Sequence, residues 1–402
     1  MNDPLTGSEV LIKLIFTYLS ILFGLGTPLF AGAPLARQKP RIAYITPYQA
    51  GSHYWEQTFL VMEKVAKSLD FEFVHYNYED KNAKIMQEKV LRLLKSVHRP
   101  DAIIIAVVGE YTIPLMDAAE ENHIAIIIQR TLTPEERLAL GSEARHKYKH
   151  WIASFRQDEV EKGYKSAMAL FSQLSQTKIP GHTGKIDLVA LSGPASWIGS
   201  ALRNDGMRKA LKHFPNIEVK EVASTDWTPE EGRRQMDRMM KLYPNLSGAW
   251  AASDTLAMTA LDALAQTGKK RGVDIFASGI DMSDTGLSQI VKGELVASSA
   301  MSMLGFAEML IYIYDYLQGI DFAQEIGTLI MPNIYTATLE NAHEHLELYN
   351  RIDKINFRRF SKSYNHDLRR YNVSLTAFLD DVGIHICSGA KQSRELCYQN
   401  SP

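Results

Sequence analysis

Short apolar runs alternate with amphipathic stretches along most of the chain. The run at 42–45 is followed by a stretch, 55–69, whose apolar residues recur every three or four positions, the spacing of one helix face. Residues 102–108 form a continuous, largely β-branched apolar run, as in a strand covered on both faces. Strands and helices that alternate with short connections predict parallel sheets wrapped by helices, which is an α/β fold.

The alternation runs twice, and a charged stretch at 133–150 separates the two series and is expected to lie on the surface. Strands are predicted at 42–45, 71–76, 102–108, 124–128, 151–154, 185–191, 217–223, 248–252, 273–277 and 295–300. Helices are predicted at 55–69, 85–97, 112–122, 158–171, 199–213, 229–242, 254–266, 283–292 and 304–317. The order of these elements predicts two α/β lobes.

Two features at the chain ends suggest export. An apolar segment from Leu14 to Leu25 precedes Pro28 and a cluster of small residues, a pattern typical of a secretory signal and short for a membrane span. An uncleaved anchor and a buried hydrophobic arm are the alternatives. The only cysteines, Cys387 and Cys397, are close enough in sequence to form a disulfide in an oxidising compartment, or are two unrelated thiols.

Composition and motifs exclude several classes of protein. A formal net charge of -2 gives no reason to expect a nucleic-acid partner. No Gly-rich phosphate loop and no G-x-G-x-x-G after the first predicted strand is present. Gly193-Pro194-Ala195-Ser196 is not a nucleophile elbow, and His343-Glu344-His345 lacks the histidine spacing of a zinc helix. The sequence therefore predicts no catalysis, no cofactor and no metal site.

Polar and aromatic residues gather where the predicted strands end. In open α/β sheets, ligands bind beyond the carboxyl ends of the strands. Aromatic faces stack on sugar rings, while Arg donates hydrogen bonds to hydroxyl groups and Asp accepts them. The candidate ligand contacts are Ser52, Tyr54, Trp55, Gln129, Arg130, Arg203, Trp227, Ser253, Asp254 and Asp281.

Four of these candidates also have a purely structural interpretation. Trp55 is placed to be a core residue at the start of its helix, and Trp227 to cover the edge of a lobe. Asp254 stands where an N-cap is favoured. Arg203, followed by Asn204-Asp205, is placed to form a surface ion pair. The ligand hypothesis rests on the position shared by all of the candidates, after predicted strands.

Seven short segments carry a family resemblance through their order and intervals. They are Gly51-Ser52-His53-Tyr54-Trp55, Gln129-Arg130, Leu202-Arg203-Asn204-Asp205-Gly206-Met207, Thr225-Asp226-Trp227, Ser253-Asp254-Thr255-Leu256-Ala257, Gly279-Ile280-Asp281 and Lys292-Gly293-Glu294-Leu295. With them, the chain from Lys39 to about Asn341 resembles type I periplasmic binding proteins of the ribose/galactose group. It is also similar to the periplasmic receptor for the signal autoinducer-2.

The resemblance implies two Rossmann-like lobes with parallel sheets, joined by three hinge crossings near Ser154, Ala300 and Met331, which close over a ligand. With the leader and the tail, the expected division is as follows: signal peptide, 1–36; N-terminal lobe, 37–154 and 302–330; C-terminal lobe, 155–301 and 331–345; C-terminal extension, 346–402. The extension, apolar mainly near 375–379, is expected to be helical and to dock on a membrane partner or to pack across the lobes.

The resemblance also assigns the candidate contacts to lobes and leaves the ligand open. First-lobe contacts would be Ser52, Tyr54, Trp55 and Arg130, and second-lobe contacts would be Arg203, Trp227, Ser253 and Asp281. The sugar-binding relatives usually carry an acidic residue where Gln129 stands, Asn at Ser253 and a polar residue at Met301. The autoinducer-2 receptor has a basic residue at the position of Met301 and an aromatic residue at that of Ile280.

The function expected from these features is capture of a small, sugar-like ligand in the periplasm and its delivery to an ABC permease. The alternative is a periplasmic sensor that presents the bound ligand to a membrane histidine kinase or cyclase. A cytoplasmic sugar-responsive repressor shares the fold, but the leader contains no helix-turn-helix pattern. An enzyme on the same scaffold is the remaining class, since fold alone does not decide function.

Overall fold

The computed structural model describes residues 39–46, 53–77, 83–106, 111–177 and 184–384. The predicted signal segment at 1–36, Ser52, Cys387 and Cys397 lie outside these residues, so the leader and the disulfide stay predictions. No helix of the described part combines the length and the apolar character needed to cross a bilayer.

The first lobe contains a six-stranded sheet in the order β11-β5-β4-β3-β1-β2, with all neighbours parallel. Its strands are β1 (Arg41–Thr46), β2 (Glu72–Asn77), β3 (Ala102–Ile105), β4 (Ala125–Ile128), β5 (Trp151–Phe155) and β11 (Leu329–Ile330). Its helices are α2 (His53–Leu69), α3 (Ala83–Leu94), α4 (Thr112–Glu121), α5 (Pro134–Leu140), α11 (Leu304–Leu317) and α12 (Ala323–Ile326).

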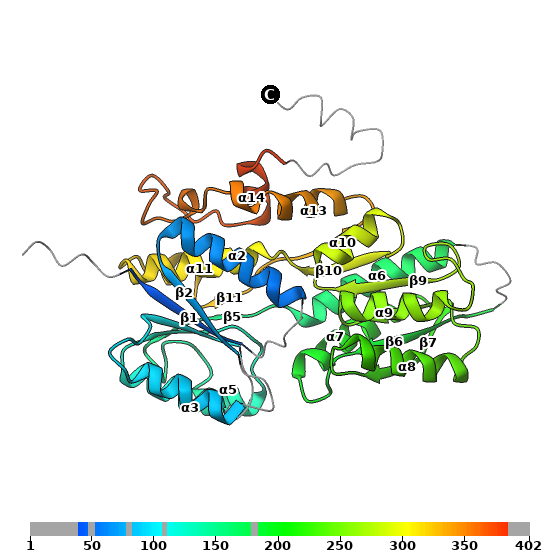
Figure 1. Ribbon diagram of the computed structural model, residues 1–402, viewed down its shortest axis with the longest axis horizontal. Helices are drawn as coiled ribbons and strands as arrows, with labels where there is room; N and C mark the ends of the chain where they lie inside the picture. Colours follow the sequence, from blue (N-terminus) through cyan, green and yellow to red (C-terminus); the bar gives the residue numbers. More distant parts are fainter. Residues whose placement is uncertain (1–38, 47–52, 78–82, 107–110, 178–183, 385–402) are drawn as a thin grey trace, which may run out of the picture. The chain divides into compact units, whose positions relative to one another are not determined.

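Alternation along each strand divides this sheet between two cores. On β1, Ile42 and Tyr44 belong to a core shared with α2 and α11, whereas Ala43 and Ile45 belong to one shared with α3 and α4. Successive strand residues point to opposite faces, so a run that is apolar at every position buries both. Figure 1 shows α2 and α11 on one side of the first sheet and α3 on the other.

The second lobe contains a six-stranded sheet in the order β12-β10-β9-β8-β6-β7, in which only the β10–β12 pair is antiparallel. Its strands are β6 (Ile186–Ser192), β7 (Ile217–Ser224), β8 (Gly248–Ala251), β9 (Phe276–Ile280), β10 (Ala297–Met301) and β12 (Ile334–Thr338). Its helices are α6 (Glu159–Gln176), α7 (Ile198–Leu211), α8 (Pro229–Leu242), α9 (Asp254–Ala265) and α10 (Asp284–Val291). One face packs on α6 and α7, the other on α8, α9 and α10.

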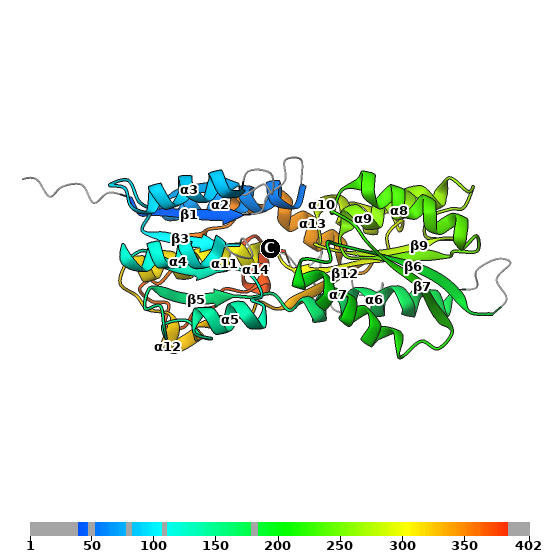
Figure 2. The same ribbon diagram turned by 90° about the horizontal axis from the view of Figure 1, so that it is seen from below.

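The chain passes between the two sheets three times: from β5 to α6, from β10 to α11 and from β11 to β12 (Figure 2). The α/β fold with two lobes and three crossings that the sequence predicted is therefore confirmed. The tertiary structure adds β11 and β12, for which the hydrophobic pattern gave no signal because β11 contains only two residues and β12 is half-buried at the edge of its sheet.

Two sequence predictions need correction. The charged stretch 133–150 contains α5, which begins with a capping box between Thr133 and Glu136, and Leu140 and Tyr148 from this stretch are buried. The strand predicted at 273–277 begins only at Phe276, because Val273 lies in a turn and is exposed.

The C-terminal extension rests on both lobes. It begins within α13 (Ala342–Asn350) and contains the 3-10 turns η3 (Ile352–Lys354) and η4 (Phe357–Phe360), and α14 (Leu375–Asp381). Phe357, Phe360 and Phe378 belong to the first-lobe core, whereas α13 packs against α10 of the second lobe. Figure 1 shows α13 and α14 on the outer side of α2 and α10.

Candidate functional site

Arg203 is the centre of a buried charged cluster in the second lobe. Its Nε donates a hydrogen bond to Glu159 Oε2 at 2.6 Å, and its Nη1 donates to the carbonyl oxygen of Ala252 at 2.6 Å. Asp281 Oδ1 lies 3.9 Å from the same Nη1. Arg203 is only 7% exposed, so the surface ion pair that its sequence neighbours suggested is not formed; Asp205 pairs with Arg208 instead.

Glu159 is shared between two cations. Lys162 Nζ lies 2.9 Å from Glu159 Oε1, while Arg203 holds the other carboxylate oxygen. Burial opposes the charged form of Glu159, but Arg203 and Lys162 outweigh it and lower the pKa of the carboxyl. Burial lowers the pKa of Lys162, and the attraction of Glu159 opposes that effect. Neither Glu159 nor Lys162 is among the candidates predicted from the sequence, although their i, i+3 spacing directly after the first crossing is a visible signal.

A close helix contact sets the positions of Glu159 and Arg203. A Cβ placed on Gly163 of α6 would lie 2.0 Å from the carbonyl oxygen of Arg203 on α7. A Cβ on Gly206 would lie 2.1 Å from the carbonyl oxygen of Val160. Only glycine at both positions lets the two backbones approach this closely, and this approach brings the guanidinium of one helix to the carboxylate of the other.

Two tryptophans flank the guanidinium. The Cζ atom of Arg203 lies 5.1 Å from the ring centroid of Trp197 and 5.6 Å from that of Trp227. The two rings meet edge to face, with centroids 5.8 Å apart. Trp227 has a left-handed backbone, with φ of 74°, and its ring occupies the place that a side chain at Gly193 would need. Trp197 is not among the sequence candidates, although it follows β6 more closely than Arg203 does.

Asp281 and Asp254 bring two carboxyl groups to the ends of β9 and β8. Burial raises the pKa of Asp281 to about 7; Arg203 opposes this shift, and Asp254 adds to it. Burial raises the pKa of Asp254 to about 6. Asp254 Oδ2 accepts hydrogen bonds from the backbone N–H and the hydroxyl of Ser283, both at 2.8 Å. With pKa values near neutrality, both the ionised and the protonated forms of these carboxyl groups are populated, so each group can accept a hydrogen bond or donate one.

Ser253, rather than Asp254, is the N-cap of α9: its hydroxyl accepts a hydrogen bond from the backbone N–H of Leu256 at 3.2 Å. The structural interpretation of Asp254 as an N-cap is therefore wrong, because the capping position is one residue earlier. Asp254 instead ties the start of α9 to Ser283, the N-cap of α10. A cap whose hydroxyl already accepts a backbone hydrogen bond can still donate its own proton to a ligand.

Tyr54 is the first-lobe residue whose side chain interacts electrostatically with the cluster around Arg203. It is the second residue of α2, and its ring meets Trp55 edge to face at 5.3 Å. Burial raises the pKa of the Tyr54 hydroxyl above its usual range, and the negative charge of Asp281 raises it further. A hydrogen bond with Gln157 and the positive charge of Arg203 have the opposite effect. The Tyr54 hydroxyl is therefore within the electrostatic influence of the charged groups of the second lobe.

Trp55 and Gln129 are held by the first-lobe core. The Trp55 ring stacks on Phe59 at 6.1 Å and lies 6.2 Å from Tyr44. The Tyr44 hydroxyl donates a hydrogen bond to Gln129 Oε1 at 2.8 Å. The structural interpretation of Trp55 thus has support, since it packs on the first-lobe core, although the residue remains partly exposed.

Arg130 is engaged within its own lobe. Its Nη1 and Nη2 donate to the two carboxylate oxygens of Glu136, each at 2.7 Å, and Nη2 also donates to Thr112 Oγ1 at 2.8 Å. Two parallel charge-assisted bonds fix the plane of the guanidinium. Arg130 stays a proposed ligand contact, now with Glu136 as the group that orients it.

A family model described as a periplasmic binding protein domain matches residues 42–320. The chain is 26% identical over 164 residues to a xylitol-binding protein of Mycolicibacterium smegmatis, which covers 40% of this chain and 46% of that protein. It is 30% identical over 114 residues to a D-apiose import binding protein of Paraburkholderia graminis, covering 28% and 36%. The matched stretches span less than half of these curated relatives.

The fold is also similar to solved structures. A periplasmic sugar-binding protein from Pseudomonas fluorescens superposes with a TM-score of 0.72 at 23% identity, over 84% of this chain and 99% of that one. A galactofuranose binding protein gives a TM-score of 0.63 at 18% identity, over 78% and 100%. These TM-scores establish a shared fold.

Proposed function

Because the chain belongs to the periplasmic binding protein domain family, we propose that it captures a small, sugar-like ligand between its lobes and delivers it to an ABC importer. The family resemblance found in the sequence is confirmed by the matches, and the relatives reported above are binding proteins, as expected of a chain that is not an enzyme. The observation that carries the proposal is the cluster around Arg203, which lies at the carboxyl ends of the second-lobe strands.

The charges of this cluster favour a neutral, hydroxyl-rich ligand. Glu159 balances one of the two cations Lys162 and Arg203. Two carboxyl groups with pKa values near neutrality, Asp281 and Asp254, face the other. A site in which positive and negative side chains nearly balance each other has no strong preference for an anionic or a cationic ligand. It does offer donors and acceptors side by side, which is what an array of hydroxyl groups requires.

The aromatic groups fit the same ligand class. Trp197 and Trp227 flank the guanidinium, and Tyr54 approaches from the first lobe. Aromatic faces bury the apolar faces of a sugar ring, while the charged groups bind its hydroxyls. We propose Tyr54, Trp55, Gln129 and Arg130 as first-lobe contacts with Ser52, and Arg203, Trp227, Ser253, Asp254 and Asp281 as second-lobe contacts. Relatives bind xylitol and D-apiose, which makes pentoses, polyols and furanoses the first compounds to test.

The test is a thermal-shift screen of the protein against pentoses, hexoses, furanoses, polyols and nucleosides, followed by calorimetry of any hit. A ligand that binds only the folded state stabilises it by about 2.7 kcal/mol at a hundredfold excess over its Kd. The Arg203→Lys variant keeps the charge and should lose about tenfold or more in affinity, since an ammonium group cannot replace the planar guanidinium that Glu159 and the carbonyl oxygen of Ala252 hold in place. A hit that binds this variant with undiminished affinity would place the ligand elsewhere.

Delivery and location are tested separately. Fractionation of cells should place the chain in the periplasm, and removal of residues 1–36 should keep it in the cytoplasm. With the permease reconstituted in vesicles, the ligand-loaded chain should stimulate ATP hydrolysis. Tight ligand binding without any effect on the permease would instead favour the sensor that presents its ligand to a membrane kinase or cyclase.

A further inference from the structure

The C-terminal extension is anchored on α11 by one buried carboxylate. Asp315 is fully buried and accepts hydrogen bonds from Ser361, Lys362, Ser363 and Tyr371 of the extension. A buried carboxylate with this many donors is fully satisfied only when the extension is in place. Residues 361–371 of the extension are therefore part of the folded first lobe.

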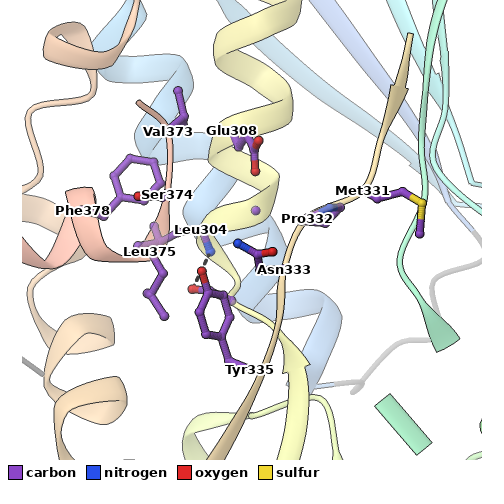
Figure 3. Close-up of a pocket in the computed structure, with 12 residues that line it drawn as sticks. Leu304, Glu308, Met331, Pro332, Asn333, Tyr335, Val373, Ser374, Leu375 and Phe378 are labelled. Atoms are coloured by element: carbon purple, nitrogen blue, oxygen red, sulfur yellow. Dashed lines mark hydrogen bonds between the residues drawn. The ribbon is translucent and has the colours of Figure 1, made fainter. Parts of the chain in front are cut away.

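The anchored extension covers two of the three crossings and leaves a cavity beneath it. The cavity has a volume of about 100 Å³, room for several non-hydrogen atoms. Its walls come from the crossing that leads into α11, from the crossing between β11 and β12, and from the segment that leads into α14 (Figure 3). The lining residues are Ser302, Leu304, Gly305, Glu308, Met331, Pro332, Asn333, Tyr335, Val373, Ser374, Leu375 and Phe378.

Glu308 is the charged group of this cavity. Figure 3 shows its side chain and that of Asn333 directed towards the same space, with Leu375 and Phe378 closing the opposite side. The Tyr312 hydroxyl donates a hydrogen bond to Glu308 Oε1 at 3.0 Å. Among the residues that the structure describes, no Lys, Arg or His forms an ion pair with Glu308. Arg156 reaches the lining at Met331 Sδ.

Burial raises the pKa of Glu308 to about 7, and the Tyr312 hydrogen bond opposes that shift. Glu308 is partly removed from solvent and has no cation paired with it in the described part of the chain. A positive ligand therefore interacts more favourably with this carboxylate than with an exposed one. The other polar groups of the lining include Asn333, Ser374 and Tyr335, which are neutral and can bind a hydroxyl or a second N–H.

We propose that this hinge cavity is a second ligand site, distinct from the cluster around Arg203, which binds a small organic ammonium ion through the Glu308 carboxylate. The ammonium donates to Glu308, and a short polar tail contacts Asn333. The apolar side chains of Leu375 and Phe378 cover its methylene groups. The site exists because the extension closes over the crossings.

A molecule in this cavity contacts both lobes. Glu308 belongs to α11 of the first lobe, while Tyr335 belongs to β12 of the second sheet, and the remaining walls are crossings and extension. The crossings are the segments that change when such lobes move relative to each other. An ammonium ion that binds one lobe arrangement more tightly shifts the population towards it and thereby changes the affinity of the site around Arg203. By linkage, a ligand at the site around Arg203 changes the ammonium affinity by the same factor.

The test uses ethanolamine as the probe, titrated by calorimetry into the purified protein to roughly 20 mM, because a ligand of so few atoms reaches only moderate affinity. Ethylene glycol, which has the same length and no charge, is the matched control ligand. We expect ethanolamine to bind at one site and ethylene glycol to bind at least tenfold more weakly. No heat of ethanolamine binding at the highest concentration would overturn the proposal.

Substitutions in the cavity test whether ethanolamine binds beside Glu308. Glu308→Gln should reduce ethanolamine affinity by about tenfold or more, which corresponds to about 1.4 kcal/mol. Arg203→Lys, in the main site, should leave ethanolamine affinity unchanged, so this proposal and the proposed sugar site fail independently. If Glu308→Gln does not fold, Asn333→Leu at an exposed position fills the cavity without altering α11 and should block binding. Equal binding by the wild type and by the folded Glu308 or Asn333 variant would refute the site.

Discussion

Arg203 and Glu159 come from different helices and form a buried ion pair, with Nε and Oε2 2.6 Å apart. The pair is possible because glycines at the α6–α7 contact let the helix backbones approach. It places a fixed donor group at the ends of the second-lobe strands, with the guanidinium plane already oriented between two tryptophan rings. Because the donor group is fixed before a ligand arrives, binding does not incur the entropic cost of ordering it.

Removal of one partner of this pair should destabilise the fold. Arg203→Ala leaves Glu159 buried with Lys162 as its one remaining cation among the described residues, and the loss should be about 3 kcal/mol in the free energy of unfolding. Urea denaturation measures it. Arg208→Ala on the same helix removes an exposed pair with Asp205 and should change stability by about 0.5 kcal/mol or less. Equal effects of the two substitutions would contradict the burial argument.

The α6–α7 contact should tolerate no added methyl group. Gly163→Ala places a Cβ on the carbonyl oxygen of Arg203, so α7 must shift. We expect a loss of stability of about 2 kcal/mol together with weaker ligand binding, since the guanidinium moves with its helix. Ser172→Ala on α6 is the control and should stay within about 0.5 kcal/mol. Retention of both stability and affinity in Gly163→Ala would show that the helices can separate without cost.

Asp281 should make the free protein less stable as the pH rises. Its pKa is raised to about 7 in the folded chain, against an ordinary value near 4 when unfolded. Between these values the folded state holds a proton that the unfolded state has released, so the free energy of unfolding falls as pH rises through this window. The charged groups that face it are Arg203, Asp254, Lys162 and Glu159.

Asp281→Asn should remove this contribution. The variant should be more stable than the wild type at pH 8, and the difference should vanish towards pH 4, while its ligand affinity falls. Urea denaturation at a series of pH values measures the difference, with the exposed Asp205→Asn as a control that should show none. A variant that is less stable than the wild type at pH 8 would mean that the Arg203 interaction outweighs burial.

Arg130 and Glu136 allow a test of the first-lobe contacts. If Arg130 binds the ligand, Arg130→Ala should weaken binding by roughly 2 to 4 kcal/mol. Glu136→Gln keeps the guanidinium and loosens its orientation, so its effect on affinity should be smaller. Calorimetry with the screened ligand measures both. If the two variants lose stability equally and keep full affinity, Arg130 has a structural role only.

Asp315 should control the extension. Asp315→Ala removes the acceptor of hydrogen bonds from four residues, so we expect a loss of about 3 kcal/mol. Hydrogen exchange should rise at 361–371 before it rises in the sheets. Asp321→Asn, which weakens a partly exposed pair with Arg145, is the control and should cost about 1 kcal/mol or less. Unchanged exchange in the extension would show that its apolar contacts alone hold it.

The hydrophobic pattern of the sequence determined most of the fold. Runs such as 102–105, apolar at each position, predicted strands buried on both faces, and the structure divides their side chains between two cores. The local pattern was less informative at β11, which has only two residues, and at the start of β9, which is preceded by the exposed Val273. It also missed α5, because a helix whose one buried residue is Leu140 has the pattern of a charged surface stretch.

The sequence by itself determined that polar and aromatic residues follow the strands, because the chain order of strands, helices and strand ends is local information. Only the tertiary structure decided which of them meet. Glu159 reaches Arg203 across a helix contact, Arg130 turns to Glu136, and the extension covers the crossings through Asp315. The first and third of these pairings join segments far apart in the chain, whereas Arg130 and Glu136 are six residues apart. Close packing and burial decide all three, and no local spacing records them.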